Sequence, residues 1–250
     1  MGLKESGLRG SLRNVSVGID AIPDSGGENQ WNWTAGDGTV VVDVNGESDA
    51  NFNSLSWGTG QGAGDVFGSL NGSEFADLGN EVFTSLLEGG GTLFQWLRTD
   101  ANDSERRSVF STQLTSSGDN FGFQIWNDGT NEYRAGIAID GNFAQPTAGD
   151  PNSHRGEWVA YALVYDGESV TTYNSVPATD YSVSEIASEA LTATKTGTWD
   201  QSVRYGASDD GSGDERRQFN GDLDIGFFKS AALSPSDLQS FVDETKQYYE

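Results

Sequence analysis

Residues 156–167 read GEWVAYALVYDG, and residues 219–228 read FNGDLDIGFF. Both stretches are rich in β-branched and aromatic residues, which favour strands. The first ends in an Asp-Gly pair, a composition typical of tight hairpin turns. Residues 169–173, SVTTY, follow that pair and predict a second strand antiparallel to the first. The pattern therefore predicts an antiparallel β-protein.

Short segments of the same kind recur earlier in the chain, separated by Gly, Asn-Gly or Asp-Gly. They are residues 39–43, 91–98, 121–126 and 133–139. Many short strands at such spacing predict an all-β, two-sheet antiparallel sandwich. A chain of 250 residues is compatible with one undivided domain of this class.

The last segment predicts a short C-terminal helix. Ser234 can cap it, Pro235 suits the first helical position, and Asp237 completes a capping-box pattern. Residues at helical spacing then share one face, namely Leu238, Phe241, Val242 and Thr245. We expect this face to pack on the edge of the sandwich.

The order and spacing of these segments resemble those of a known family. Residues 156–167 resemble the strand pair of the laminin-G-like, concanavalin A-like jelly rolls, and residues 219–238 resemble their closing strand and terminal helix. The similarity extends over roughly residues 30–245 and is stronger in its second half. It implies a jelly-roll domain over residues 29–250 that serves mainly as a binding scaffold, preceded by a separate segment, residues 1–28.

The resemblance also implies a structural calcium ion, Ca2+. Members of the family hold one between an opening Asp-x-Ser/Asn-Gly turn and an aspartate of the closing strand, so Asp43, Asn45 and Asp224 would be the ligands here. Calcium takes about six to eight oxygen ligands, and two distant carboxylates would join the first and last strands. Ile225 stands where a second acidic residue is common, and ordinary turn and strand roles for the aspartates are the alternative.

The charge of the chain is extreme. Thirty-eight acidic residues face fourteen Lys and Arg, for a formal net charge of −24. Self-repulsion at this density destabilises a compact state in dilute buffer, and salt relieves it because the Debye length falls to about 3 Å at 1 M. We interpret the composition as that of a halophilic protein. It argues against nucleic acid and anionic membranes as partners.

Residues 1–28 differ from the rest. Within residues 1–13, Lys4, Arg9 and Arg13 outnumber Glu5, so this stretch is locally basic on an acidic protein. We expect an anchoring arm that docks on an acidic neighbour, a floppy terminus being the alternative. The chain has no cysteine, no apolar run of membrane-spanning length and no signal-peptide core behind Met1. These features lead us to expect synthesis in the cytoplasm without membrane insertion.

Little in the sequence points to catalysis. Related glucanases carry an E-x-D-x-x-E strand, whereas residues 74–81, EFADLGNE, have the wrong spacing and residues 222–224 lack a third acid. His154 is the sole histidine and there is no cysteine, so neither a zinc cluster nor a nucleophile–histidine pair suggests itself. We expect no enzymatic activity.

Sugar binding is the favoured activity. Lectin-like sandwiches use an exposed aromatic ring that stacks on a pyranose beside polar hydrogen-bonding groups. The candidates on expected loops are Trp57, Trp126, Tyr133, Arg155 and Trp199. We expect Trp96 and Trp158 to lie in the core instead.

One hypothesis reconciles a fold common outside cells with the missing export signal. The protein would be a lectin-like adhesion module on the surface of a halophilic virion, binding host-surface glycan or glycoprotein, with residues 1–28 attached to other virion proteins. A structural spike, turret or decoration protein, self-associated as a trimer or pentamer, is the alternative. A glycan hydrolase, or a protein that stays in the cytoplasm, is less favoured.

Overall fold

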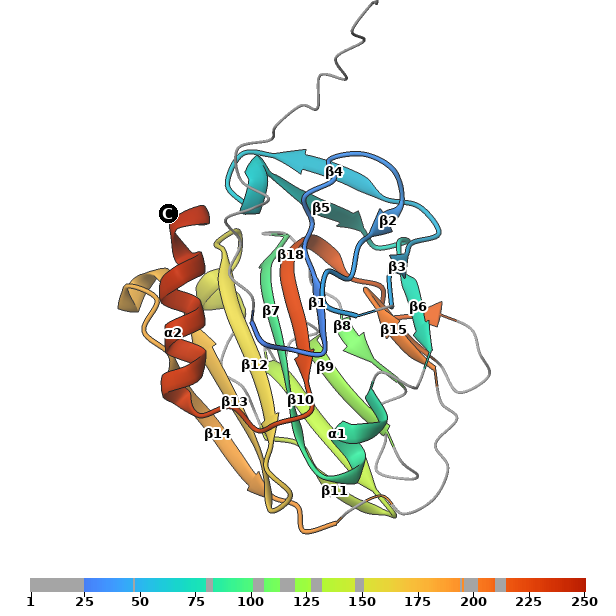
Figure 1. The fold of residues 1–250 in the computed structure, drawn as a ribbon, viewed down its shortest axis with the longest axis vertical. Coiled ribbons are helices and arrows are strands. Elements are labelled where there is room, and N and C mark those ends of the chain that lie inside the picture. The colour runs from blue at the N-terminus through green and yellow to red at the C-terminus, as the bar shows by residue number, and fades with distance from the viewer. Residues whose placement is uncertain are drawn as a thin grey trace, which may run out of the picture.

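A computed structural model describes residues 25–46, 48–79, 83–100, 106–112, 120–126, 132–146, 151–193, 195, 202–209 and 215–250. Within these ranges the chain forms two large antiparallel sheets and a short C-terminal helix (Figure 1). The predicted two-sheet sandwich is therefore confirmed. Of the expected arm, residues 1–24 lie outside the described residues.

The larger sheet has eight described strands. Its order is β14 (Ser184–Ala190), β13 (Ser169–Ser175), β12 (Val159–Tyr165), β7 (Gly91–Thr99), β18 (Asn220–Lys229), β5 (Val66–Asn71) and β4 (Ser56–Thr59), with β1 (Asn29–Trp31) also paired to β18. β7 thus lies between two strands that are far from it in sequence. The predicted hairpin at Asp166-Gly167 joins β12 to β13.

The second sheet has six described strands. Its order is β11 (Asn142–Ala144), β10 (Glu132–Ile139), β9 (Asn120–Trp126), β8 (Arg106–Ser111), β15 (Val203–Tyr205) and β6 (Ala76–Gly79). Two small sheets pair β2 (Val40–Val41) with β3 (Ala50–Asn51) and β16 (Ser208–Asp209) with β17 (Glu215–Arg216). The helices are α1 (Thr84–Glu88) and α2 (Pro235–Thr245), with short 3-10 turns η2 (Ala63–Asp65), η4 (Pro151–His154), η5 (Pro177–Thr179) and η6 (Lys246–Tyr248).

One hydrophobic core fills the space between the large sheets. The ring of Tyr205 stacks on Phe110 with centroids 4.2 Å apart. Its hydroxyl accepts a hydrogen bond from Trp33 Nε1 at 3.1 Å and donates one to Gln95 Oε1 at 2.6 Å. These three buried polar groups are therefore paired with each other, which avoids the free-energy cost of leaving them unsatisfied.

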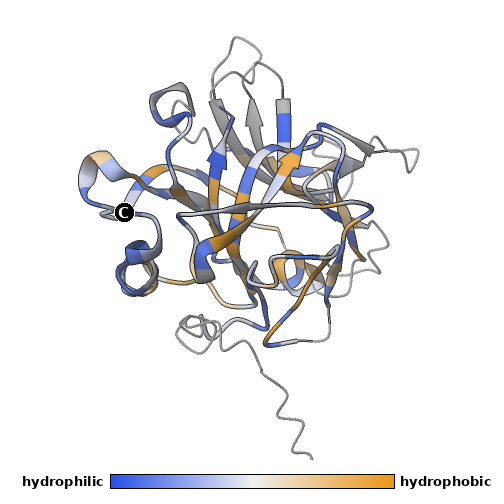
Figure 2. Ribbon diagram, turned by 90° about the horizontal axis from the view of Figure 1, so that it is seen from above, coloured by the Kyte–Doolittle hydropathy of each residue, from blue (hydrophilic) through white to orange (hydrophobic). Residues whose placement is uncertain are grey.

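A second core covers the outer face of the larger sheet, beneath α2. Phe94 of β7 and Phe227 of β18 stack with centroids 5.0 Å apart, and Phe241 of α2 meets both rings edge-on. Strand β12 is consequently buried along its whole length. A strand buried on both faces needs apolar residues at every position, which explains why residues 159–165 read as a continuous apolar run. The strands carry most of the hydrophobic residues in Figure 2.

The helix begins as predicted. Ser234 Oγ accepts from the backbone N–H of Asp237, whose carboxylate accepts from the backbone N–H of Ser234, so the capping box is complete. The expected inner face of α2 is buried, and Thr245 on that face accepts a hydrogen bond from Trp96 Nε1 at 3.0 Å. The helix is therefore fixed both by its cap and by the sheet beneath it.

We predict that Phe241→Ala lowers the free energy of unfolding by about 3–5 kcal/mol, because it leaves a cavity between α2 and the stacked rings of Phe94 and Phe227. Urea denaturation in molar salt measures the effect. The exposed neighbour Ser240, changed to Ala, should shift the free energy by no more than about 0.5 kcal/mol. A loss below about 1 kcal/mol for Phe241→Ala would mean that α2 does not stabilise the sheet in this way.

Candidate functional site

A hollow of about 590 Å³ opens at one end of the larger sheet, beside the C-terminal residues. The letter C in Figure 1 marks that end of the chain. Four segments that are distant in sequence form the wall of the hollow. These segments contribute Gln61, then residues 156–158, then Pro177, Asp180 and Tyr181, and finally residues 249–250. The hollow thus lies where the end of the chain meets three connections at the edge of the sandwich.

Glycine is required at the point where two of these segments meet. The backbone N–H of Gly62 donates to the carbonyl oxygen of Tyr248 at 2.9 Å, which ties the η2 connection to η6. Gly62 has a φ of 155°, and an added Cβ would lie 2.7 Å from the carbonyl oxygen of Val66 and 3.0 Å from Asp224 Oδ2. A larger residue would therefore separate the walls of the hollow.

The wall after η5 is formed by a tight left-handed turn. Asp180 and Tyr181 have φ values of 51° and 56°. Their backbone N–H groups donate to the carbonyls of Pro177 and Val176, both at 3.0 Å. This turn directs the ring of Tyr181 inward, where it meets Trp96 edge-on with centroids 5.4 Å apart.

The floor of the hollow is aromatic. The ring of Tyr249 stacks on Trp96 with centroids 4.1 Å apart and lies 5.0 Å from the ring of Trp158. Trp158, Tyr249 and Tyr181 are only 2%, 3% and 4% exposed, so they present ring edges to the hollow rather than open faces. The rings are held rigidly by this packing.

Within the described part of the chain, three polar atoms of this region are buried and have no hydrogen-bond partner. They are Trp158 Nε1, the Tyr249 hydroxyl and Asp224 Oδ1. Trp158 and Tyr249 line the hollow, and Asp224 lies behind Tyr249 with its Oδ2 accepting from the backbone N–H of Ala63 at 2.6 Å. Buried polar groups are nearly always paired with protein, water or ligand, so this floor has hydrogen-bonding capacity left for a bound molecule.

Burial also controls protonation at the floor. It raises the pKa of Asp224 well above its usual value, against the hydrogen bond from Ala63 that lowers it. Burial likewise raises the pKa of Tyr249, and the adjacent Asp224 carboxylate adds to the shift. The charged forms of both side chains are therefore disfavoured in the folded protein.

The rim of the hollow carries Glu157, Asp180 and Glu250, all exposed. Lys246 Nζ lies 3.8 Å from Asp180 Oδ2, and His154 Nδ1 lies 3.4 Å from Glu157 Oε2. Burial raises the pKa of Tyr181 to about 12, and the charges of Glu250 and Glu157 contribute to the rise. Both carboxylates therefore act on the interior of the hollow.

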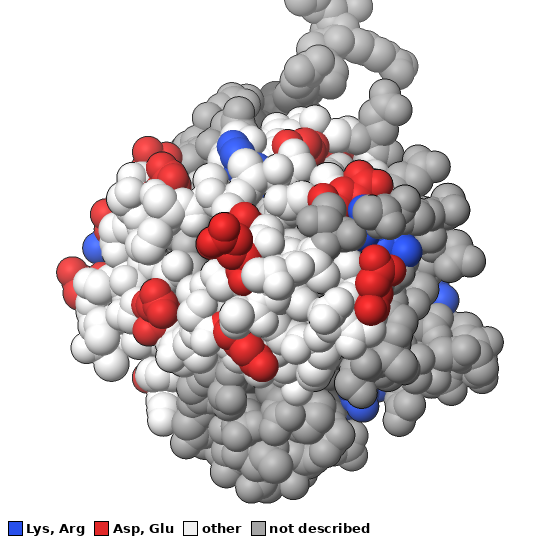
Figure 3. Space-filling view, turned by 90° about the horizontal axis from the view of Figure 1, so that it is seen from below, with Lys and Arg blue, Asp and Glu red and all other residues white. Residues whose placement is uncertain are grey.

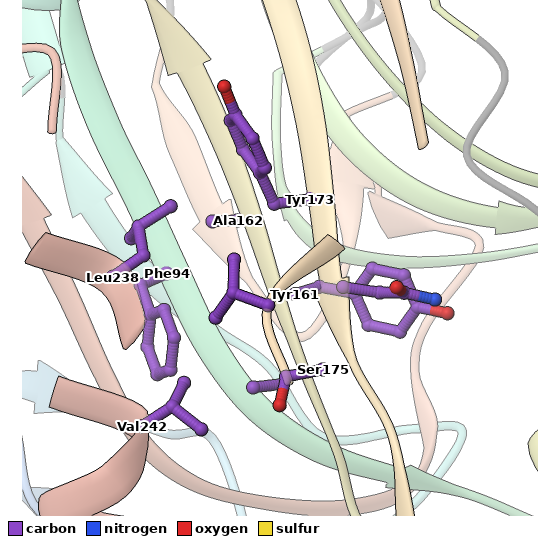
Figure 4. A pocket seen from close by; sticks show the side chains of 10 residues that line it. Phe94, Tyr161, Ala162, Tyr173, Ser175, Leu238 and Val242 are labelled. Atoms are coloured by element: carbon purple, nitrogen blue, oxygen red, sulfur yellow. The ribbon is translucent and has the colours of Figure 1, made fainter. Parts of the chain in front are cut away.

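Two other cavities are less suited to a ligand. Figure 4 shows one beneath α2, where Leu238 and Val242 point towards Phe94. Its volume of about 10 Å³ leaves room for roughly one water molecule. The other is a groove of about 270 Å³ beside α2, where Lys229 Nζ already donates to the carbonyl oxygen of Gly26 at 2.6 Å.

The predicted sugar-binding residues do not gather in one place. Trp57 lies on strand β4 rather than in a loop; it is half-buried, its Nε1 donates to the carbonyl oxygen of Gly38 at 2.9 Å, and its ring packs edge-on against Trp33. Arg155 precedes Gly156 at the hollow but does not line it. Trp199 and the side chains of Trp126 and Tyr133 lie outside the described residues. Trp158 is in the core as predicted, yet it also lines the hollow.

The predicted calcium ligands lie in two separate hydrogen-bond networks. Asp43 Oδ1 accepts from three backbone N–H groups and Oδ2 from a backbone N–H and a side-chain amide. These donors are Gln30, Asn45 and Gly46 at 2.9–3.2 Å, then Ser48 and Asn29. Asp43 is therefore surrounded by N–H groups where calcium would need oxygen atoms.

The residues present do not fit a calcium ion shared by Asp43 and Asp224. Asp224 interacts with Ala63 and Tyr249, and neither of these residues hydrogen-bonds to Asp43. Within the described residues, no group of three or more His, Cys, Asp or Glu is placed to hold a metal ion. Calcium stays a prediction from the resemblance, and we derive no role from it.

Comparisons with known proteins agree with this architecture. The family described as the concanavalin A-like lectin/glucanases superfamily matches residues 70–239. The chain belongs to this superfamily. A comparison with curated proteins gives no match. No helix within the described ranges has the length and apolar character needed to cross a membrane.

Three solved structures illustrate the similarity of fold. The binding domain of botulinum neurotoxin serotype D has a TM-score of 0.58 at 12% identity, covering 88% of this chain and 51% of that one. Domain 4 of the arabinanase AbnA from Geobacillus stearothermophilus, in complex with arabinotriose, has a TM-score of 0.53 at 15% identity. The alignment covers 85% of this chain and 96% of that one. The CBM40 of the Ruminococcus gnavus IT-sialidase, bound to α2,3-sialyllactose, has a TM-score of 0.52 at 16% identity. The alignment covers 70% of this chain and 95% of that one. This chain thus spans about half of the neurotoxin domain, and at these identities the likeness is one of fold.

We predict that Asp224→Asn stabilises the protein at neutral pH. An unfolded aspartate titrates near pH ~3.9, whereas the folded pKa is raised, so the folded state binds more protons between these values and loses stability as the pH rises through them. Asparagine can still accept from Ala63 and removes this loss, for a gain of about 1–2 kcal/mol.

Urea denaturation at pH 4 and pH 8 tests the prediction, with the gain present at pH 8 and absent at pH 4. Asp222→Asn is the matched control on the same strand, because Asp222 is paired with Arg98 Nε at 2.7 Å and should give no gain. Equal pH dependence in the wild type and Asp224→Asn would contradict the assignment.

Proposed function

We propose that this protein is a carbohydrate-binding module whose site is the hollow between Trp158, Tyr181, Tyr249 and the acidic rim. The observation that carries the proposal is the unpartnered indole N–H and phenol hydroxyl on an aromatic floor, inside an open hollow. The hollow has the volume of ordinary small-molecule sites, which lie at about 300–1,000 Å³. It therefore accommodates one or two sugar rings.

The chemistry of the wall matches that of a sugar. Sugar hydroxyls donate and accept hydrogen bonds, and the hollow offers donors at Trp158 and Tyr249 with acceptors at Gln61 and the rim carboxylates. The edges of the buried rings supply an apolar surface for the C–H groups of a pyranose. A rigid floor reduces the entropy that binding must overcome.

The fold supports the same proposal. The superfamily is named for lectins and glucanases, and two of the solved structures contain an oligosaccharide, arabinotriose or sialyllactose. These ligands belong to those proteins. They show that sandwiches of this shape carry sugar sites, which in this chain we assign to the hollow.

We predict that the protein binds glycans on an array in molar salt, and that binding survives a calcium chelator. With the best glycan, Gln61→Ala and Asp180→Asn should each lower affinity three- to tenfold, the first by removing a hydrogen bond and the second by replacing a charged acceptor with a weaker neutral one. Asparagine tolerates the left-handed backbone at position 180. Titration calorimetry measures the change.

The control is Glu168→Ala, at the hairpin beyond the other end of β12, about 23 Å from the hollow along a seven-residue strand. It should leave the affinity unchanged. Absence of any glycan binding would refute the proposal. Loss of binding in the chelator would restore the calcium prediction instead.

A more specific version of this proposal places the protein on the surface of a halophilic virion. It is supported by the net charge of −24 and by the acidic side chains that outnumber basic ones on the described surface in Figure 3. Host-surface glycan would be the target, and residues 1–28 the attachment to other virion proteins. Recovery of the protein as a soluble, unassembled species from uninfected cells would contradict this form.

A self-associating structural protein is the second candidate, and an exposed apolar stripe favours it. Val40, Val42 and Val44 are 37%, 49% and 50% exposed, while Val41 and Asp43 between them are buried. Alternate residues of an extended segment share one side, so the three valines form a stripe that another copy could cover.

For this candidate we predict a defined oligomer by sedimentation equilibrium in molar salt, which Val42→Asp converts to monomer without loss of thermal stability. The exposed neighbour Asn45→Asp adds the same charge outside the stripe and should leave the oligomer intact. A monomeric wild-type protein would eliminate the structural candidate.

A further inference from the structure

We infer that the hollow selects uncharged glycans and rejects acidic ones, such as those that end in sialic or uronic acid. This inference rests on the proposed function and adds the class of ligand to it. It follows from the charge of the rim taken together with the unpartnered groups of the floor.

The rim has more negative than positive charge. Among the described residues, Glu157, Asp180 and Glu250 line the hollow and no Lys or Arg does. Lys246 is shared between Asp180 and Asp243, whose Oδ1 lies 3.4 Å from its Nζ, so it does not offset the whole rim. Arg155 lies in the same loop as Glu157, two residues before it, but does not line the hollow.

The influence of this charge reaches the interior. Glu250 and Glu157 both help to raise the pKa of Tyr181, a residue that is 4% exposed on the hollow's wall. The same field that disfavours a tyrosinate there disfavours a carboxylate on a bound ligand. A unit charge about 7 Å from another in water changes affinity about threefold, so two carboxylates change it about tenfold.

The floor gives an uncharged ligand its own partners. Trp158 Nε1 has no hydrogen-bond partner among the described residues, and its side chain is more than nine-tenths buried. A sugar hydroxyl can accept a hydrogen bond from the indole and donate one to a rim carboxylate. An ionised ligand carboxylate can only accept, so it cannot bond to the rim. The rim therefore binds hydroxyl groups and repels acids with the same atoms.

The solved relatives do not decide this question. The R. gnavus CBM40 is bound to sialyllactose, yet it shares 16% identity with this chain over the aligned region. Ligand class depends on the side chains of a site and not on the fold. The acidic wall described here predicts the opposite preference.

The test is an array of matched pairs in which each neutral oligosaccharide is printed beside its sialylated or uronic-acid-bearing form. We expect about tenfold stronger binding to the neutral member at the lowest ionic strength at which the protein stays folded. The preference should shrink as salt is raised, because salt screens exposed charges. Equal or stronger binding to the acidic members would overturn the inference and leave the proposed function standing. No binding to either form would overturn the proposed function, and this inference with it.

Two variants locate the effect. Glu157→Gln and Glu250→Gln keep side-chain size and should each raise affinity for the acidic member about threefold relative to the neutral one. Glu168→Gln removes the same charge at the far hairpin and should leave that ratio unchanged. A ratio that responds equally to all three would mean that net charge, and not this hollow, sets the preference.

Discussion

Tyr249 stacks on Trp96 and meets Trp158, and through this contact the end of the described chain closes the outer face of the larger sheet. The central strands of that sheet are apolar on both sides, so the outer face has to be covered. α2 covers its middle with Phe241, and Tyr249 covers the end that α2 does not reach. The candidate site exists because this cover is incomplete at one corner.

The same constraint explains the unusual polarity of that corner. Packing three aromatic rings against the sheet also buries the Trp158 indole N–H and Asp224 Oδ1, which have no hydrogen-bond partner among the described residues. Such groups lower stability by about 1–3 kcal/mol each when they stay unsatisfied. Proteins often leave buried polar groups unpaired at their binding sites, and here such groups lie beside an open hollow.

Much of the fold could be predicted from the sequence because its signals are local. The Asp166-Gly167 turn, the continuous apolar strand before it and the capping box at Ser234 each specify their structure within a few residues. The burial of Trp96 and Trp158 followed from their positions in strong strand patterns. The superfamily likewise followed from the order of two motifs.

The site could not be predicted in this way. Its wall combines Gln61 with residues 156–158, 177–181 and 249–250, whose proximity depends on tertiary packing. Trp57 has glycines around it that suggested a loop, but pairing with β5 makes the segment a strand. Asp43 matches a metal-binding motif, yet the backbone folds its N–H groups onto the carboxylate, a feature that sequence spacing does not show. Glycine at position 62, required by close contacts, is a local signal near the hollow.

The most direct measurement is the position of the tryptophan indole N–H resonances by NMR during titration with a glycan that the protein binds. Trp158→Phe identifies the Trp158 resonance, and Trp57, hydrogen-bonded to Gly38, provides an internal reference away from the hollow. A ligand in the hollow shifts the Trp158 resonance and leaves that of Trp57 in place. A shift of Trp57 alone, with Trp158 unchanged, would place the ligand at the edge of β4 and contradict the account.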